Sequence, residues 1–157
     1  MLLKKGAEVN AYGGEYGSAL IAVSSKGHDK IVQMLLEKAA DMLLEKGADV
    51  NAQNEWIGNA LHAASSKGHD KIVQMLLEKG ADVNAQDEWI GNALQAASSN
   101  GHHNIVQMLI EKGADVNAPD RLNGNALQAA SYGGHDSVVQ LLLEKGAEGW
   151  SHRHGIL

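Results

Sequence analysis

Cysteine, phenylalanine and threonine are absent from the 157-residue chain, and proline occurs only once. Without cysteine the chain has no disulfide, no thiolate metal ligand and no cysteine nucleophile. Aromatic residues make up 4% of the chain and hydrophobic residues 44%, so a core has to be built from Leu, Ile, Val, Ala and Met. That hydrophobic content argues against a disordered chain, and the length is that of one ordinary domain.

Positive charge is also scarce, because 13 Lys and Arg residues stand against 19 Asp and Glu residues, for a net charge of −6. Non-specific binding to nucleic acid or to an anionic membrane needs a basic surface, so we expect neither partner. No apolar run approaches the roughly 18 to 20 residues that span a bilayer. The first residues, Met1 to Lys5, do not form a signal peptide. These features predict an intracellular, cytoplasmic protein.

An internal repeat with a period of 33 residues runs through the sequence. The string Gly-Ala-Asp-Val-Asn begins at Gly47, Gly80 and Gly113, and a variant begins at Gly146. The string Asn-Ala-Leu begins at Asn59, Asn92 and Asn125. A fourth copy, Ser-Ala-Leu, begins at Ser18, which is 41 residues before Asn59, so this first unit carries eight extra residues.

Each unit predicts two helices and a turn-rich connector. Asn92 can cap a first helix over residues 93–99, because its side-chain oxygen accepts a hydrogen bond from an early backbone N–H. Gly101 ends that helix, and a second helix with a wide apolar stripe follows over about residues 102–112. Gly113 then supplies the left-handed residue beyond the helix end. Neither helix can bury its apolar side alone, so we expect successive units to pack against one another about 10 Å apart and form a solenoid.

Three motifs recur in fixed order: Ala-Leu-(His/Gln)-Ala-Ala, Gly-His-x-x-Ile-Val-Gln-Met-Leu-Leu and Gly-Ala-Asp-Val-Asn. Together they resemble the ankyrin repeat over nearly the whole chain, which implies an all-α solenoid of stacked helix pairs with short hairpin loops. The family's Thr-Pro-Leu-His is Asn-Ala-Leu-His at Asn59 and Asn-Ala-Leu-Gln at Asn92 and Asn125. Only His62 therefore keeps the histidine that builds a hydrogen-bond ladder elsewhere in the family. The Asn-Ala-Leu-Gln-Ala-Ala-Ser variant resembles ankyrin arrays at the C-termini of large fungal signalling receptors.

The repeat boundaries predict a single array over residues 1–150 and an off-repeat tail over residues 151–157. The array divides into a partial unit and four helix pairs, over residues 1–13, 14–54, 55–87, 88–120 and 121–150. Residues 1–10 match residues 75–84, so we expect the chain to start within a second helix. Stable arrays usually carry polar capping units, and none is recognisable, so the chain is expected to be a piece of a longer array.

A tandem duplication accounts for the long first unit, since residues 34–41 are repeated as residues 42–49 with one Gly-to-Ala change. Ala39 stands where the second copy has Gly47, and alanine favours helix over the left-handed cap. We therefore expect one helix from about His28 to Lys46, longer than its counterparts by about 12 Å. A bulged loop that restores the ordinary spacing is the alternative.

Residues suited to metal binding or catalysis recur but do not converge. A histidine follows glycine in every unit, at His28, His69, His102 and His135. Zinc ligands lie about 2.0–2.1 Å from the metal, whereas equivalent residues of stacked units lie about 10 Å apart. His152 and His154 in the tail could bind a metal ion only with further ligands. Because His-Glu-x-x-His, Gly-x-Ser-x-Gly and phosphate-binding Gly-Lys-Ser motifs are also missing, we expect no enzyme activity and no cofactor, metal or nucleotide.

The positions that differ between units lie at the hairpin tips and at the ends of the first helices. In proteins that resemble this one, these positions line the concave surface that contacts a partner, and Trp and Tyr are common interface anchors. The predicted partner-binding residues are Glu15, Lys26, Glu55, Trp56, Lys67, Glu88, Trp89, Asn100, Arg121, Leu122 and Tyr132. The alternative for the two tryptophans is that they pack on the apolar residues of neighbouring hairpins, Ile57 and Ile90.

Two functions follow from this interpretation. The first is a non-enzymatic module that binds a protein partner, of unknown identity, through its concave face. The second is a structural array whose uncapped ends stack into dimers or fibres. A concentration series in light scattering separates the two, because only self-assembly increases the mass in the absence of a partner.

Overall fold

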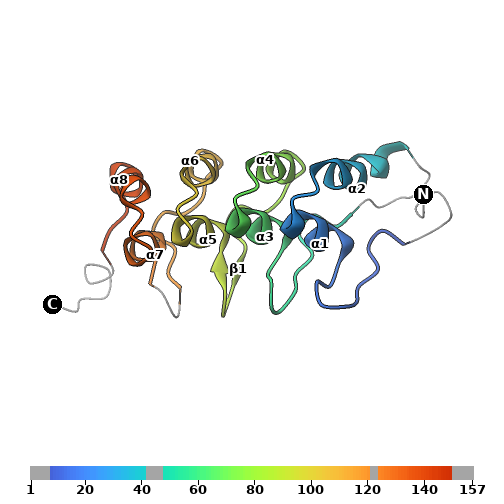
Figure 1. Ribbon diagram of the computed structural model, residues 1–157, viewed down its shortest axis with the longest axis horizontal. Coiled ribbons are helices and arrows are strands. Elements are labelled where there is room, and N and C mark those ends of the chain that lie inside the picture. Colours follow the sequence, from blue (N-terminus) through green and yellow to red (C-terminus); the bar gives the residue numbers. More distant parts are fainter. Residues whose placement is uncertain (1–7, 42–47, 121–123, 150–157) are drawn as a thin grey trace.

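Stacked helix pairs make up the part of the chain that the computed structural model describes, residues 8–41, 48–120 and 124–149. The first helices of the pairs are α1 (Ala19–Lys26), α3 (Ala60–Lys67), α5 (Ala93–Ser99) and α7 (Ala126–Tyr132). The second helices are α2 (Asp29–Asp41), α4 (Asp70–Glu78), α6 (His103–Glu111) and α8 (Asp136–Glu144). Figure 1 shows the first helices in one row and the second helices in another. The predicted all-α solenoid of stacked helix pairs is confirmed.

Polar caps start the first helices, as expected from the Asn-Ala-Leu motif. The side chain of Asn92 accepts a hydrogen bond from the backbone N–H of Gln95 at 2.9 Å, and Asn59 does the same for His62 at 2.8 Å. Gln95 also accepts from the N–H of Asn92, which completes a capping box. Asn125 heads a second capping box of the same kind. Hydrogen bonds between residues close in sequence therefore define the first residue of each first helix.

Glycines with positive φ follow the ends of α4, α6 and α8. Gly113 follows α6 with a φ of +94°, and Gly80 follows α4 with a φ of +88°. These are left-handed conformations, which glycine adopts without the steric cost that a Cβ brings. The observed bounds of α5 and α6 lie within one residue of the predicted helices.

α2 differs from the other second helices in its length. It spans 13 residues, against 9 in α4, and it continues through Ala39, the position at which the equivalent glycine ends the other helices. The helix is described as far as Asp41. Its predicted continuation to Lys46 falls on residues 42–47, outside the described residues.

Short hairpins precede the first helices and project from their row (Figure 1). In the third hairpin, β1 (Gln86–Asp87) pairs antiparallel with β2 (Gly91–Asn92), and Asp87 lies opposite Gly91. Equivalent single bridges join Gly13 to Gly17, Asn54 to Gly58 and Asp120 to Gly124. The hairpins thus repeat one pairing geometry at their bases along the array.

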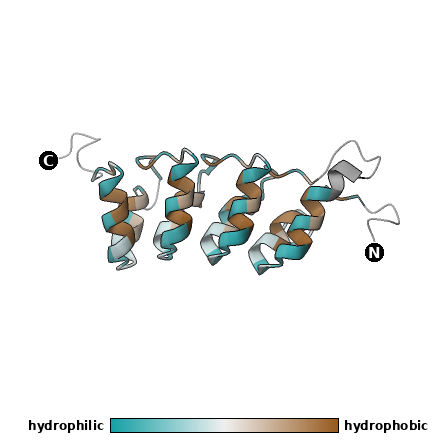
Figure 2. Cartoon of the chain, turned by 90° about the horizontal axis from the view of Figure 1, so that it is seen from above, coloured by the Kyte–Doolittle hydropathy of each residue, from teal (hydrophilic) through white to brown (hydrophobic). Residues whose placement is uncertain are grey.

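The hydrophobic core lies between the two rows of helices and continues from unit to unit. Figure 2 shows hydrophobic and hydrophilic residues alternating along each helix, as expected for helices with one buried side. Leu61, Ile72 and Leu76 are fully buried in the second unit. Neighbouring first helices make more extensive contacts than neighbouring second helices do. Small residues explain this difference, because Ala63 and Ala64 on α3 let adjacent backbones approach closely.

Asparagines tie each unit to the next at the ends of the second helices. The Asn84 side chain accepts a hydrogen bond from the N–H of Asp115 at 2.8 Å and donates one to the carbonyl of Gly113 at 3.0 Å. Asn51 and Asn117 make the same two bonds to the units that follow them. This contact explains in physical terms why Asn ends the repeated Gly-Ala-Asp-Val-Asn string.

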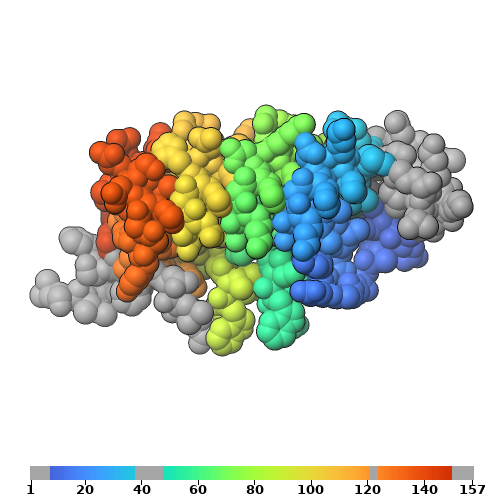
Figure 3. Space-filling view, in the orientation of Figure 1, coloured from blue at the N-terminus to red at the C-terminus, as the bar shows by residue number. Residues whose placement is uncertain are grey.

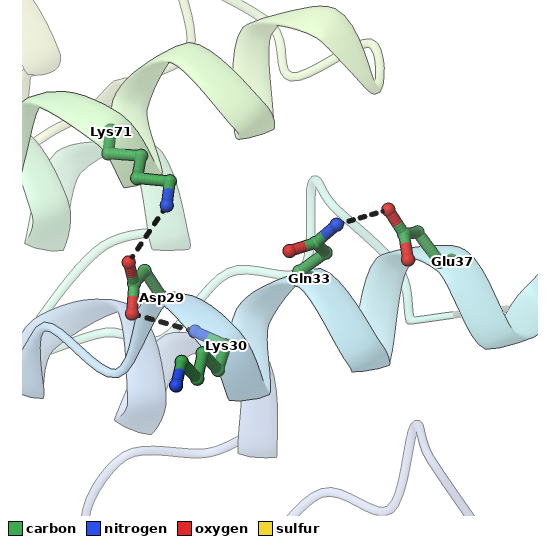
Figure 4. Close-up of polar contacts among 5 residues, drawn as sticks. All are labelled: Asp29, Lys30, Gln33, Glu37 and Lys71. Atoms are coloured by element: carbon green, nitrogen blue, oxygen red, sulfur yellow. Dashed lines mark hydrogen bonds and ion pairs between the residues drawn. The ribbon is translucent and has the colours of Figure 1, made fainter.

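Polar contacts also join the exposed sides of the second helices (Figure 4). Lys71 Nζ on α4 lies 3.2 Å from Asp29 Oδ2 on α2, and the Lys30 backbone N–H donates to Asp29 Oδ1 at 2.8 Å. The hydrogen bond from Lys71, followed by that from Lys30, lowers the pKa of Asp29. Because both partners of the ion pair are solvated, it adds little stability.

Candidate protein-interaction surface

The second and third hairpin tips are each held by the side chain of an Asn or Asp at the base, whereas the first hairpin has Gly13 at that position. Asn54 Oδ1 accepts hydrogen bonds from the backbone N–H groups of Trp56 at 2.8 Å and Ile57 at 3.1 Å. Asp87 Oδ1 accepts from Trp89 at 2.8 Å in the same way. Asn and Asp favour such turns because their short side chains can replace a backbone acceptor. The backbone that carries each tryptophan is therefore fixed before a partner binds.

The tryptophan side chains themselves are left in solvent. Trp56 is 81% exposed and Trp89 is 61% exposed. Ile90 makes the contact between these neighbouring hairpins, because its side chain packs against Gly58. A Cβ built on Gly58 would lie only 2.9 Å from Cδ1 of Ile90. Figure 3 shows the two hairpins as separate lobes at the lower edge of the molecule. Packing on neighbouring isoleucines thus does not bury these two indole rings.

Two grooves separate successive hairpin tips. The first has a volume of about 730 Å³ and is lined by the tips of the first and second units, including Tyr12, Glu15 and Trp56. The second has a volume of about 570 Å³ and lies between the second and third tips, against Glu55 and Trp89. We call Glu15, Glu55, Trp56, Glu88 and Trp89 the hairpin-tip row.

The ends of the first helices carry a second set of predicted residues, Lys26, Lys67, Asn100 and Tyr132, which we call the helix-end row. All four are exposed, and Tyr132 is 90% exposed. Lys26 Nζ lies 5.5 Å from the centre of the Tyr16 ring, a cation–π distance. A hydrogen bond with Tyr16 raises the pKa of Lys26, and the charge of Glu15 adds to the effect. The remaining predicted residues, Arg121 and Leu122, lie outside the described residues.

The recurring histidines connect neighbouring units, which the sequence pattern alone did not reveal. His69, His102 and His135 place Nε2 at 3.2, 3.1 and 3.0 Å from the carbonyl oxygens of Ser25, Ser66 and Ser99, each in the preceding unit. Each ring lies against the glycine that ends the preceding first helix, where a Cβ would come within 2.7 Å. Over residues 8–41, 48–120 and 124–149, no three His, Asp or Glu side chains gather as metal ligands. His152 and His154 lie outside these ranges.

A second series of contacts between units involves His62 and the glutamines that replace it. His62 Nε2 lies 3.2 Å from the carbonyl oxygen of Ile90, and burial lowers the pKa of the ring. Gln95 occupies the equivalent position and donates to the carbonyl of Ala118 at 3.0 Å. Glutamine at this position therefore forms a different bond, to the connector that precedes the next hairpin rather than to the hairpin itself.

Helix pairs stacked in a line, with their variable side chains on hairpin tips and helix ends, define a repeat protein that presents an extended surface. No helix within the described ranges has the length and apolar character needed to cross a bilayer. A family model described as ankyrin repeats, in three copies, matches residues 1–87 and again residues 61–152. The chain belongs to the ankyrin repeat family, whose members are generally protein–protein interaction modules and typically not enzymes.

Among characterised proteins, the chain is similar to the azaphilone pigments biosynthesis cluster protein L of Monascus ruber. The two are 65% identical over 34 residues, which is 22% of this chain and 7% of that protein. The similarity is therefore about one repeat long and covers a small part of the relative.

Proposed function

We propose that this ankyrin array is a non-enzymatic module that binds a protein partner through the hairpin-tip row and the helix-end row. The observation that carries the proposal is the exposure of Trp56 and Trp89 on tips whose backbones are already fixed by Asn54 and Asp87. Large aromatic side chains on rigid loops bury much area at little entropic cost, and they dominate protein interfaces. Exposed apolar side chains of this size otherwise lower solubility.

The proposed units are those of the sequence repeat, with a partial unit followed by four helix pairs. Each pair contributes one hairpin tip and one helix end, so a partner would contact several units at once. The repeated contacts of Asn84 and His102 with neighbouring units hold these tips in a constant relation to one another. A partner can therefore bind several tips without the entropic cost of ordering them.

Selection of peptides from a random display library on the wild-type array tests this proposal. Selected peptides should bind Trp56→Ala and Trp89→Ala about fivefold or more weakly than the wild type. Ile31→Ala is the matched control, because Ile31 is an exposed apolar side chain on α2, outside both rows. Peptides that lose affinity equally with Ile31→Ala, or with none of the three variants, would contradict the proposal.

A further inference from the structure

The two grooves between hairpin tips combine aromatic rings with carboxylates. Tyr12 and Trp56 line the first groove together with Glu15 and Glu55. The second groove is lined by two tryptophans and three acidic residues, Glu55, Trp56, Asp87, Glu88 and Trp89. Among all the lining residues of the two grooves, each within the described ranges, there is no Lys, Arg or His. Glu55 and Trp56 belong to both grooves and so form the wall between them.

We propose that the hairpin-tip row binds an extended basic segment of the partner protein, with one Lys or Arg side chain entering each groove. This inference rests on the proposed function and adds the chemistry of the partner. A cation is attracted to the face of Trp or Tyr and forms charge-assisted hydrogen bonds with a carboxylate. Each groove offers both kinds of group within one concave space.

The array already holds a cation against an aromatic ring beside the first groove. Lys26 Nζ lies 5.5 Å from the centre of the Tyr16 ring, and the neighbouring Glu15 carboxylate stabilises the charged amine. Tyr16 is the equivalent of Ile57 in the next hairpin, so the contact is built by the tip of the first unit. One unit further on Ile57 replaces Tyr16, and the exposed carboxylate and ring of that tip belong to Glu55 and Trp56, one position earlier in the hairpin.

The spacing of the grooves favours an extended segment with a particular pattern. Stacked units lie about 10 Å apart, and an extended segment in the polyproline II conformation advances about 3.1 Å per residue and returns to the same face every third residue. Three residues of the partner therefore span one unit, which predicts Lys or Arg at positions i and i+3. A helix with an apolar side is a poorer occupant, because it would bury the Glu55 carboxylate without a partner.

Synthetic peptides of about twelve residues test this pattern directly. One peptide carries Arg at every third position between Ser and Gly, a second has the same composition with its Arg residues in one block, and a third has Glu in place of Arg. Fluorescence anisotropy with the wild-type chain at about 150 mM salt measures their affinities, since this salt screens weak surface attraction. The spaced peptide should bind about tenfold more tightly than the blocked one, and the Glu peptide should not bind.

Three variants locate the site of binding. Trp56→Ala and Glu55→Gln should each weaken binding of the spaced peptide about fivefold. Glu78→Gln is the matched control, because it removes the same charge from an exposed position at the end of α4 and should change affinity less than about twofold. Circular dichroism of each variant verifies that the helices are intact.

Equal binding of the spaced and blocked peptides, or equal losses for Glu55→Gln and Glu78→Gln, would overturn the inference in favour of non-specific charge attraction. The display selection separates this failure from that of the proposed function. Selected peptides that depend on Trp56 but carry no Lys or Arg would overturn the basic segment and leave the interaction surface standing. If no selected peptide depends on Trp56, neither proposal holds.

Discussion

Replacing Gly68 with alanine perturbs the contact between two units at a single atom. Gly68 has a φ of +79°, and a Cβ built on it would lie 2.6 Å from Cε1 of the His102 ring. His102 Nε2 lies 3.1 Å from the carbonyl oxygen of Ser66, so the ring cannot move away without losing that hydrogen bond. The added methyl group therefore has two effects: it strains the backbone at residue 68, and it displaces the ring of His102.

The expected magnitude follows from these two costs. Alanine in the left-handed conformation costs about 1–2 kcal/mol. The lost hydrogen bond costs about 0.5–1.5 kcal/mol, and an off-rotamer ring costs a similar amount. Gly68→Ala should thus lower the free energy of unfolding by about 3 kcal/mol. Gly80→Ala is the matched control, because Gly80 has a φ of +88° and nothing within 4 Å of a built Cβ. It should cost only the backbone strain of about 1–2 kcal/mol.

Urea unfolding followed by circular dichroism measures the difference, with the slope of the transition as a check that the unfolded state is unchanged. A double-mutant cycle adds His102→Ala. Once the ring is gone, Gly68→Ala should cost no more than Gly80→Ala, so the two changes should not be additive. Equal losses for Gly68→Ala and Gly80→Ala in the wild-type background would refute the role assigned to the histidine ring.

Three further changes have expected outcomes. Burial lowers the pKa of His62 in the folded chain, so on acidification the unfolded chain binds a proton at this ring before the folded chain does. The free energy of unfolding should therefore fall as pH drops through the ordinary His pKa of about 6.5, and His62→Gln should remove that part of the pH dependence in urea titrations. Ser65 Oγ is buried without a hydrogen-bond partner in the described structure. Ser65→Ala should raise the free energy of unfolding by about 1 kcal/mol, whereas Ser131→Ala, which removes an exposed hydroxyl that donates to a backbone carbonyl, should not. Trp56→Ala should weaken partner binding by about 1 kcal/mol or more, yet cost less stability in thermal unfolding than Leu76→Ala, a buried truncation worth about 2–5 kcal/mol.

Local rules were sufficient to predict the helices. The cap at Asn92, the break at Gly101 and the left-handed turn at Gly113 each depend on the conformational preference of one residue, and each is found in the structure. The repeat period then predicted how the helix pairs are arranged, because units of one length and one pattern stack on one another in the same way. The all-α solenoid could therefore be derived without knowledge of any long-range contact.

Contacts between units could not be derived in the same way. The bond from His102 to Ser66 joins residues 36 positions apart, and its geometry exists only after α3 and α5 have packed. The orientation of Trp56 was equally open, since a tryptophan beside an isoleucine is compatible with packing or with exposure. Only the stacking of the hairpins decides it, because Ile90 takes the space beside Gly58 and leaves the indole outside.

The most direct test of the interaction surface is an NMR titration of the isotope-labelled chain with the tightest peptide from the display selection. If the hairpin tips make the contact, chemical-shift changes should concentrate in residues 54–58 and 87–91 and in the indole N–H signals of Trp56 and Trp89. Changes concentrated instead on α4 and α6, with the tip signals unmoved, would contradict the assignment of this surface.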